Sequence, residues 1–232
     1  MNVVSNNPDV PARNTLKYWF ARFFSNVFHP FFMPTLSTIL LFLCFPYRFA
    51  EYPQKALVLS VGLVFAITVI YPVLAIVIMY KMNMIQNVNL RNRKDRIIPY
   101  VVTLTFYTWI CYMALVPTNN NTLFPNDFIF SHMMLAMTLS IIIAFVANNF
   151  LKVSMHMLGQ GGFIGFLLFT AKYASYNFQW IFIIALFVAG CVGSARLILK
   201  AHTLQEVIAG FSIAIIAEYM AFVLLPSWGI FS

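Results

Sequence analysis

The residues best suited to chemistry in this sequence are Arg196, His202 and Glu206, which lie in the stretch GSARLILKAHTLQEVIAG after a long apolar segment. On a helix, His202 and Glu206 share one face because they are four residues apart. A carboxylate bound to an imidazole fixes its tautomer and increases its basicity, as a nucleophile or general base requires. The guanidinium of Arg196 is permanently charged and suits phosphate binding. Polar groups are costly at the mouth of an apolar segment, so this stretch is a candidate functional site.

The composition places the chain in a membrane. It has 232 residues, of which 62% are hydrophobic and 9% are charged, and 25 are Phe. A soluble domain does not need so much apolar surface. The formal net charge is +8. Because membrane proteins concentrate Lys and Arg in cytoplasmic loops, we expect the lipid bilayer and phosphate-bearing lipids as partners, and no nucleic acid. Cys44, Cys111 and Cys191 lie inside apolar runs and are interpreted as core residues.

The apolar segments predict an all-α protein, a polytopic transmembrane helical bundle with six to seven spans. Residues 1–30 are assigned to a polar tail and an interfacial amphipathic helix from Asn14 to Phe28, which ends at a structural corner, His29-Pro30. Residues 31–232 are assigned to one transmembrane helical domain. Its expected spans are Phe31–Phe45, Ala56–Tyr80 with a kink at Pro72, Ile97–Val116, Phe128–Val146, Met155–Thr170, Phe178–Gly193 and Leu204–Leu225.

Three polar loops alternate with these spans so that all three lie on one side of the membrane. Consecutive loops of the three are separated by two spans each time. The excess of Lys and Arg on their side places them in the cytoplasm by the positive-inside rule. We therefore expect an integral protein of the bacterial inner (cytoplasmic) membrane with a cytoplasmic site. In chain order the loops carry Arg91, Arg93, Lys94, Asp95 and Arg96; Lys152, Ser154 and His156; and Arg196, Lys200, His202 and Glu206.

The last of these loops reads Ala195-Arg196, five residues, His202, three residues, Glu206, and the middle one reads Val153-Ser154-Met155-His156. These patterns resemble the third and second motifs of the type 2 phosphatidic acid phosphatase (PAP2) superfamily of membrane lipid phosphatases, which are Ser-Arg, five residues, His, three residues, Asp, and Pro-Ser-Gly-His. The first family motif, Lys, six residues, Arg-Pro, has no counterpart in the loop that ends at Arg96. The resemblance covers about residues 90–215.

The resemblance implies a metal-independent lipid phosphatase that uses no cofactor. His202 would attack phosphorus and become a phosphohistidine, while Glu206 orients its ring. His156 would protonate the leaving oxygen and then activate the hydrolytic water. Met155 replaces the Gly of the family motif, and Glu206 replaces its Asp. The phosphate oxygens would be bound by Arg196, Ser154, Arg96, Lys94 and Arg91.

Other functions also agree with the sequence. A lipid phosphotransferase would share the first half-reaction and differ only in the acceptor. A non-catalytic transporter or flippase of phosphorylated lipids would use the cations but not the His202–Glu206 pair. A metal site made of His156, His202 and Glu206 is disfavoured by Arg196, which would repel a cation. Phosphatidic acid, phosphatidylglycerol phosphate, polyprenyl pyrophosphate and a lipid A phosphate all fit as substrates, and the sequence does not indicate an oligomeric state.

Two further polar residues, His132 and Glu218, lie within the predicted spans. Glu218 is twelve residues beyond Glu206, or about 18 Å deeper at 1.5 Å per residue, too far to join the same site. It is expected to be protonated, to pair with His132 or to lie near the far interface, and a role in a proton pathway stays open.

Overall fold

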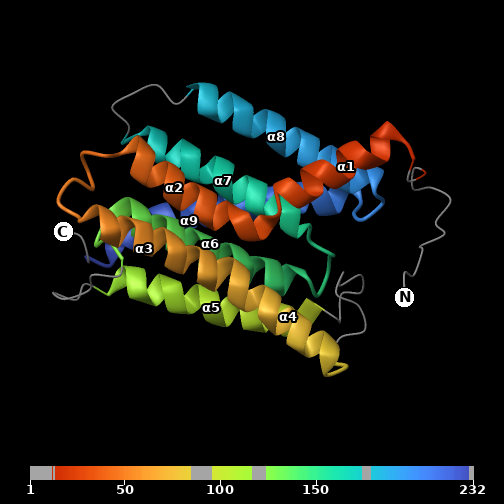
Figure 1. Cartoon of the computed structure of the whole chain (residues 1–232), viewed down its shortest axis with the longest axis horizontal. Coiled ribbons are helices and arrows are strands. Elements are labelled where there is room, and N and C mark those ends of the chain that lie inside the picture. The colour runs from red at the N-terminus through yellow and green to blue at the C-terminus, as the bar shows by residue number, and fades with distance from the viewer. Residues whose placement is uncertain (1–11, 13, 85–95, 117–123, 174–178, 230–232) are drawn as a thin grey trace.

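The computed structural model describes residues 12, 14–84, 96–116, 124–173 and 179–229, and all regular structure in these residues is helical. The helices run side by side along the long axis of the molecule (Figure 1). The predicted all-α bundle is therefore confirmed. Its elements are α1 (Leu16–Val27), the 3₁₀ turn η1 (Pro30–Phe32), α2 (Met33–Cys44), α3 (Gln54–Phe65), the π-helical turn η2 (Ala66–Ile70), α4 (Tyr71–Lys81), α5 (Ile97–Leu115), α6 (Phe128–Ala147), α7 (Met155–Ala171), α8 (Gln179–Ile198) and α9 (Leu204–Ser227).

Six helical stretches in the described residues are long and apolar enough to cross a membrane, as an integral membrane protein requires. The shorter apolar helix α7 accompanies them. Each predicted span coincides with a helix, but α8 continues beyond the predicted Gly193 to Ile198, so Arg196 lies in its last turn instead of a loop. The six stretches are Leu16–Cys44, Gln54–Lys81, Ile97–Leu115, Phe128–Ala147, Gln179–Ile198 and Leu204–Ser227.

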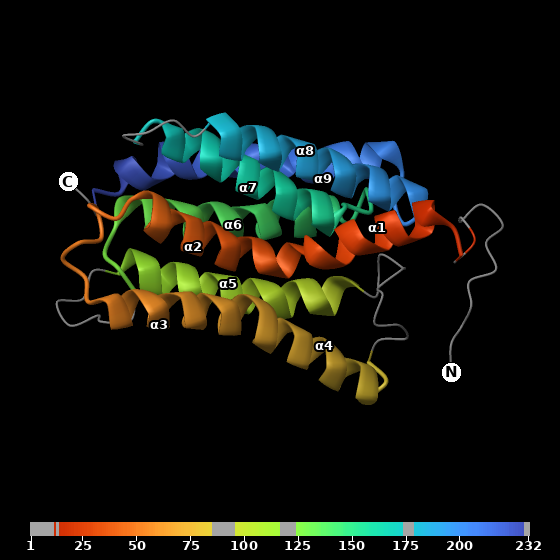
Figure 2. The same ribbon diagram turned by 45° about the horizontal axis from the view of Figure 1, so that its top comes forward.

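The N-terminal region is joined to the bundle more closely than the sequence predicts. α1 is amphipathic as expected, with Trp19 and Phe23 exposed and Ala21 and Ser25 buried. However, α1 packs along α8, and η1 joins it to α2, so that 16–44 form one apolar stretch of 29 residues. Pro30 is tolerated because it occupies the first position of the turn, where its missing N–H is not needed. The chain thus bends at the corner between α1 and α2, and from this bend α1 extends toward the C-terminal end of α8 (Figures 1 and 2).

The second long stretch contains the kink expected near Pro72. A π-helical turn, η2, lies directly before α4, whose second residue is Pro72. Proline has no N–H, and its ring crowds the carbonyl four residues earlier, so a wider turn at this point relieves the clash. The C-terminal end of α4 leans away from α5 (Figure 2).

Glycines allow α7 and α9 to pack very closely, and this packing brings the polar loops together. A Cβ added at Gly161 would lie 2.5 Å from the carbonyl oxygen of Phe211, and one at Gly210 would lie 2.5 Å from that of Ser154. Small residues at such positions let helix backbones approach each other. α5, α7 and α9 begin, and α8 ends, at the same end of the bundle (Figure 1). Arg96, the loop of Lys152–His156 and the stretch Arg196–Glu206 therefore lie at one end of the bundle, while residues 85–95 of the first loop lie outside the described residues.

Candidate active site

His202 and Glu206 form the hydrogen-bonded pair that their spacing predicts. Thr203 is the N-cap of α9: its hydroxyl accepts from the Glu206 N–H at 3.4 Å, and Glu206 Oε2 accepts from the Thr203 N–H at 3.2 Å. This capping box holds the carboxylate, whose Oε2 lies 2.8 Å from Nδ1 of His202. Because an ionised carboxylate only accepts hydrogen bonds, Nδ1 carries the proton and Nε2 of the neutral ring keeps its lone pair.

The surroundings of His202 keep its imidazole uncharged. The side chain is 4% exposed and lines a cavity. Burial lowers its pKa from 6.5 to about 4, and the bond to Glu206 opposes this shift. Arg196, Arg96 and Lys152 lower the pKa further because their positive charges repel an imidazolium. At neutral pH the unprotonated Nε2 is therefore available as a nucleophile or base.

Arg96 and Lys152 line the same cavity and are oriented by backbone carbonyls. Arg96 Nη1 donates to the carbonyl of Val153 at 2.9 Å, and Lys152 Nζ donates to the carbonyl of Ala201 at 2.9 Å. Burial lowers the pKa of the Arg96 guanidinium, so a negatively charged ligand beside it would compensate a desolvated charge. None of the described Asp and Glu side chains lines this cavity. Its polar end is therefore suited to an anion.

Arg196 reaches the cavity from the last turn of α8. Its Nη1 donates to Oγ of Ser25 in α1 at 3.3 Å. Its buried Nε has no hydrogen-bond partner within the described part of the chain. A buried N–H without an acceptor costs free energy, and a phosphate oxygen would provide one.

His156, the second predicted catalytic histidine, lines the cavity from the first turn of α7. Its Nε2 lies 3.0 Å from the backbone carbonyl oxygen of Ser25. A carbonyl only accepts, so Nε2 carries a proton and Nδ1 is the nitrogen available for proton transfer. The ring of His29 packs edge-to-face against that of His156, with 5.1 Å between centroids.

Ser154 lies behind the cavity wall, where it joins α7 to α9. It is fully buried, and its backbone N–H donates to the carbonyl of Glu206 at 3.2 Å. Gly210 packs directly against its carbonyl oxygen. Its Oγ has no partner among the described residues, and its contact with phosphate stays a prediction. Arg91 and Lys94, the other predicted phosphate ligands, lie outside the described residues.

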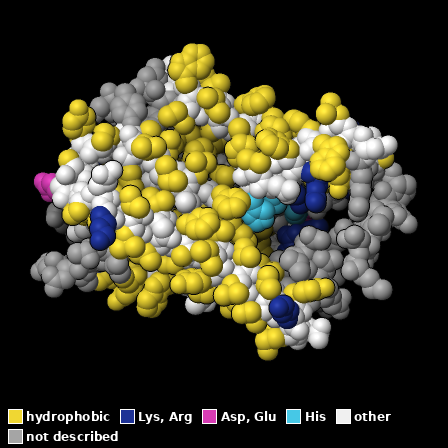
Figure 3. All heavy atoms as spheres, viewed as in Figure 1, with side chains coloured by type: hydrophobic (Ala, Val, Ile, Leu, Met, Phe, Trp, Pro, Cys, Tyr) yellow, Lys and Arg dark blue, Asp and Glu magenta, His cyan; other side chains and the backbone are white. Residues whose placement is uncertain are grey.

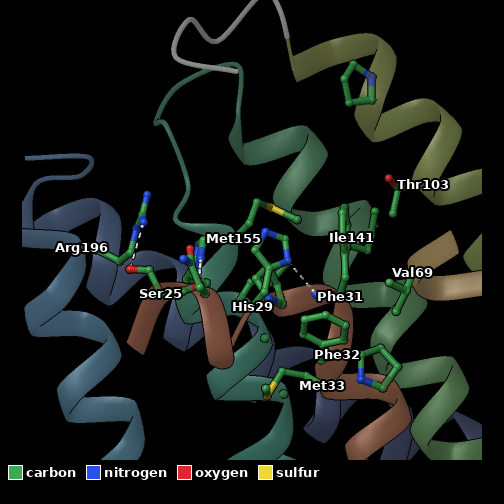
Figure 4. Close-up of a pocket in the computed structure, with 18 of the residues that line it drawn as sticks. Ser25, His29, Phe31, Phe32, Met33, Val69, Thr103, Ile141, Met155 and Arg196 are labelled. Carbon is green, nitrogen blue, oxygen red and sulfur yellow. Dashed lines mark hydrogen bonds between the residues drawn. The ribbon is translucent and has the colours of Figure 1, made fainter. Parts of the chain in front are cut away.

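The cavity has a volume of about 980 Å³ and opens on the side of the helix bundle. Figure 3 shows a hollow on this face, with histidine side chains at its edge and Lys and Arg side chains beside them. The close-up in Figure 4 shows that apolar side chains continue the wall away from Arg196. This part of the lining includes Phe32, Met33, Val69, Val73, Ile141 and Phe163.

α1 is not among the segments predicted to form the site, yet polar residues of α1 and of its C-terminal flank line the cavity. Tyr18, Arg22, Ser25 and His29 are spaced by four, three and four residues, which places them on one helical face. His29 does form the expected corner, because its Nδ1 accepts from the Phe31 N–H at 3.4 Å. Its ring also lines the cavity (Figure 4). The polar stripe along this otherwise aromatic segment is the sequence signal that could have predicted the contribution of α1 to the cavity.

Among the described residues, no group of three or more His, Cys, Asp or Glu side chains is placed to hold a metal ion. His156, His202 and Glu206, considered above as metal ligands, do not form such a group.

Comparison with known proteins gives no match to this chain among family models, curated proteins or solved structures. The likeness to the PAP2 motifs therefore rests on the residues of the polar loops and stays a prediction. The structure itself establishes an all-α bundle with apolar helices that could span a membrane.

Proposed function

We propose that the protein is a metal-independent membrane phosphatase that hydrolyses a phosphate monoester or pyrophosphate on a lipid headgroup through a phosphohistidine. The observation that carries the proposal is the state of His202, a neutral imidazole with Nδ1–H bound to Glu206 and Nε2 unprotonated. It shares a cavity wall with Arg96, Lys152 and Arg196. Anion binding alone needs neither an unprotonated imidazole nor the carboxylate that orients it.

The shape of the cavity supports a lipid as the substrate. Its polar end carries the arginines and histidines, and it continues along apolar side chains such as Phe32 and Val73. The hollow lies on the side of the bundle (Figure 3), where a bilayer would surround the apolar helices. A headgroup could bind at the polar end while its hydrocarbon chain stays among apolar groups. A soluble phosphate ester would not need the apolar part of the cavity.

The chemistry follows from the two histidines. His202 Nε2 forms a bond to phosphorus as the P–O bond to the lipid breaks, and His156, which takes up a proton on Nδ1 together with the anionic headgroup, donates that proton to the leaving oxygen. His156 then removes a proton from water, which attacks phosphorus, and the P–N bond breaks to release phosphate. Arg96, Lys152 and Arg196 stabilise the negative charge on the equatorial oxygens.

The orientation in the membrane is part of this proposal. The loop end of the bundle carries more Lys and Arg than the opposite end, which favours a cytoplasmic site. As its location we propose a bacterial inner membrane.

The test is phosphate release by the purified protein in detergent with EDTA, over a panel of lipid phosphates and pyrophosphates. Wild type is compared with His202→Ala and with His132→Ala, a buried histidine that does not line the cavity. We expect release that survives EDTA, is lost in His202→Ala and persists in His132→Ala, together with an acid-labile phosphorylated form of the wild type.

Two outcomes would contradict the proposal. Release abolished by EDTA would indicate a metal-dependent reaction. No release from any lipid by folded wild type would favour the transport of phosphorylated lipids, or phosphotransfer if a second lipid acceptor restores turnover.

A further inference from the structure

Ser25 contacts both the proton-transferring histidine and a phosphate-binding arginine. Its backbone carbonyl oxygen lies 3.0 Å from Nε2 of His156, and its Oγ accepts from Nη1 of Arg196 at 3.3 Å. The residue is buried, with 4% exposure. Figure 4 shows Ser25 facing Arg196 at the edge of the cavity. One residue of α1 thus connects α7 to α8.

The Ser25 carbonyl is available because α1 ends nearby. α1 finishes at Val27, and only the carbonyl of Phe24 is used by the C-cap residue Phe28. The residue four positions after Ser25 is His29, whose extended backbone lies outside the helix. No loop or cap N–H among the described residues donates to the Ser25 carbonyl. The corner therefore leaves the Ser25 oxygen free to bind His156.

Small residues bring this part of α1 close to the bundle. Ala21 is fully buried, and Ser25 lies one helical turn later on the face of α1 that packs along α8. The ring of His29 packs edge-to-face against the ring of His156, with 76° between the two planes, and limits its rotation. The ring of His156 is therefore held in one orientation, with Nδ1 left for chemistry.

We propose that Ser25 is a positioning residue for the reaction: its carbonyl fixes the tautomer and orientation of His156, and its hydroxyl orients Arg196. The relation of the Ser25 carbonyl to His156 is the counterpart of the relation of Glu206 to His202. This inference rests on the proposed phosphatase function. It makes α1 a component of the site, although α1 lies outside the region that resembles the PAP2 family.

Substitutions at Ser25 separate the roles of its two oxygen atoms. Ser25→Ala removes only the hydroxyl, so we expect KM for a lipid phosphate to rise by about tenfold, the loss typical of one hydrogen bond to a charged group. The value of kcat and its pH profile should be unchanged. Ser25→Thr keeps the hydroxyl and should restore KM. The control is Ser60→Ala, which removes a buried hydroxyl bonded within α3 and should change neither constant.

Ser25→Leu should move the carbonyl, because Ser25 is buried and a Leu side chain is much larger. For an alkyl phosphate we expect kcat to fall by about a hundredfold, the effect of losing a general acid. For p-nitrophenyl phosphate the loss should be much smaller, since its leaving group does not need a proton. A merely structural defect would lower both rates equally, and this result would overturn the inference.

A spectroscopic measurement tests the geometry without turnover. The chain contains four histidines, so ¹⁵N NMR of histidine-labelled protein can be assigned with one substitution at a time. We expect the proton of neutral His156 on Nε2, and of neutral His202 on Nδ1. A proton on Nδ1 of His156 would overturn the positioning role. Nε2–H at His156 in a protein that releases no phosphate would instead refute the proposed function and leave the positioning geometry intact.

Discussion

His202 and Glu206 lie in one helical turn at the end of the bundle, whereas His132 and Glu218 come from α6 and α9 and meet inside it. The first pair is joined at 2.8 Å, and the second is separated by 3.7 Å between His132 Nδ1 and Glu218 Oε2. The ring of His132 is stacked on Phe169 with 3.5 Å between centroids. Thus the chain contains two pairs of the same residue types in opposite surroundings.

The difference lies in which atom is left free. In the internal pair, His132 Nε2 lies 3.2 Å from the backbone carbonyl of Glu218 and must therefore carry a proton. Its Nδ1 faces a carboxylate oxygen, and two lone pairs would oppose each other if both groups were deprotonated. An unpaired buried carboxylate is strongly destabilising, so we expect this pair to share one proton and to be neutral overall. The outer pair, His202–Glu206, exposes a nucleophile. The inner pair, His132–Glu218, contributes to packing.

Replacing the histidine of each pair should give the largest contrast. For His202→Ala we expect phosphate release to fall on the order of a thousandfold or more, because the nucleophile is lost. For His132→Ala we expect nearly normal activity but a lower unfolding temperature, since the stacking on Phe169 disappears. Initial rates and thermal unfolding in detergent measure both. A folded but inactive His132→Ala would show that the two pairs do not have separate roles.

Replacing each carboxylate by an amide should give the next largest effect. Glu206→Gln removes the charge that fixes the His202 tautomer, and we expect kcat to fall by between about a hundredfold and ten-thousandfold. In Glu218→Gln the amide N–H can donate to Nδ1 of His132, so activity and unfolding temperature should stay close to wild type. A large loss of stability in Glu218→Gln would mean that the inner pair is ionised.

Packing around the inner pair can be tested at Gly165 in α7. A Cβ added there would lie 2.5 Å from Cγ of Glu218, so Gly165→Ala should lower the free energy of unfolding by about 1–3 kcal/mol, the usual cost of overpacking. Gly162→Ala is the matched control in the same helix, because a Cβ at that position meets nothing within 4 Å. We expect it to be neutral or stabilising by about 0.4–1 kcal/mol. Equal destabilisation by both changes would contradict the close contact with Glu218.

The smallest effect concerns pH. The pKa of His202 is lowered from 6.5 to about 4, so the neutral nucleophile persists as the pH falls through 6.5, and the acidic decline of kcat/KM attributable to His202 should lie near 4. The unfolded chain binds this proton at about 6.5, so the contribution of His202 to stability is complete above pH 6.5 and is lost between 6.5 and about 4.

Unfolding of wild type and His202→Ala across this pH range isolates that contribution. The wild type should lose more stability than the variant as the pH falls. Identical pH dependence of the two proteins would contradict a lowered pKa.

Much of the fold could be predicted because it is determined by the lengths of the apolar segments. The helices coincide with the predicted spans, and alternation alone places Arg96, His156 and His202 at one end of the bundle. The spacing of His202 and Glu206 also predicts their hydrogen bond correctly, since both lie within one helical turn. These features depend on local sequence or on the order of the spans.

The features that could not be predicted from the sequence depend on contacts between distant segments of the chain. The bond of the Ser25 carbonyl to His156 involves a backbone atom, which composition and motifs do not describe. The sequence leaves the pairing of His132 with Glu218 as one of several alternatives, because it depends on the rotation of α6 relative to α9. Likewise, the place of Ser154 behind the wall follows from the close approach of Gly210, which only the packed helices reveal.

The glycine contacts between α7 and α9 have a consequence for the motions of the protein. His156 lies at the start of α7 and His202 directly before α9, so both histidines are carried by the two helices that are fastened most closely. α1 and α4 also line the cavity, but α1 packs on α8 and α4 packs on α5. Exchange of a lipid should therefore proceed by movement of α1 or α4, while the spacing of the two histidines stays constant. The rate of turnover would then be set by these outer helices and by the fluidity of the surrounding bilayer.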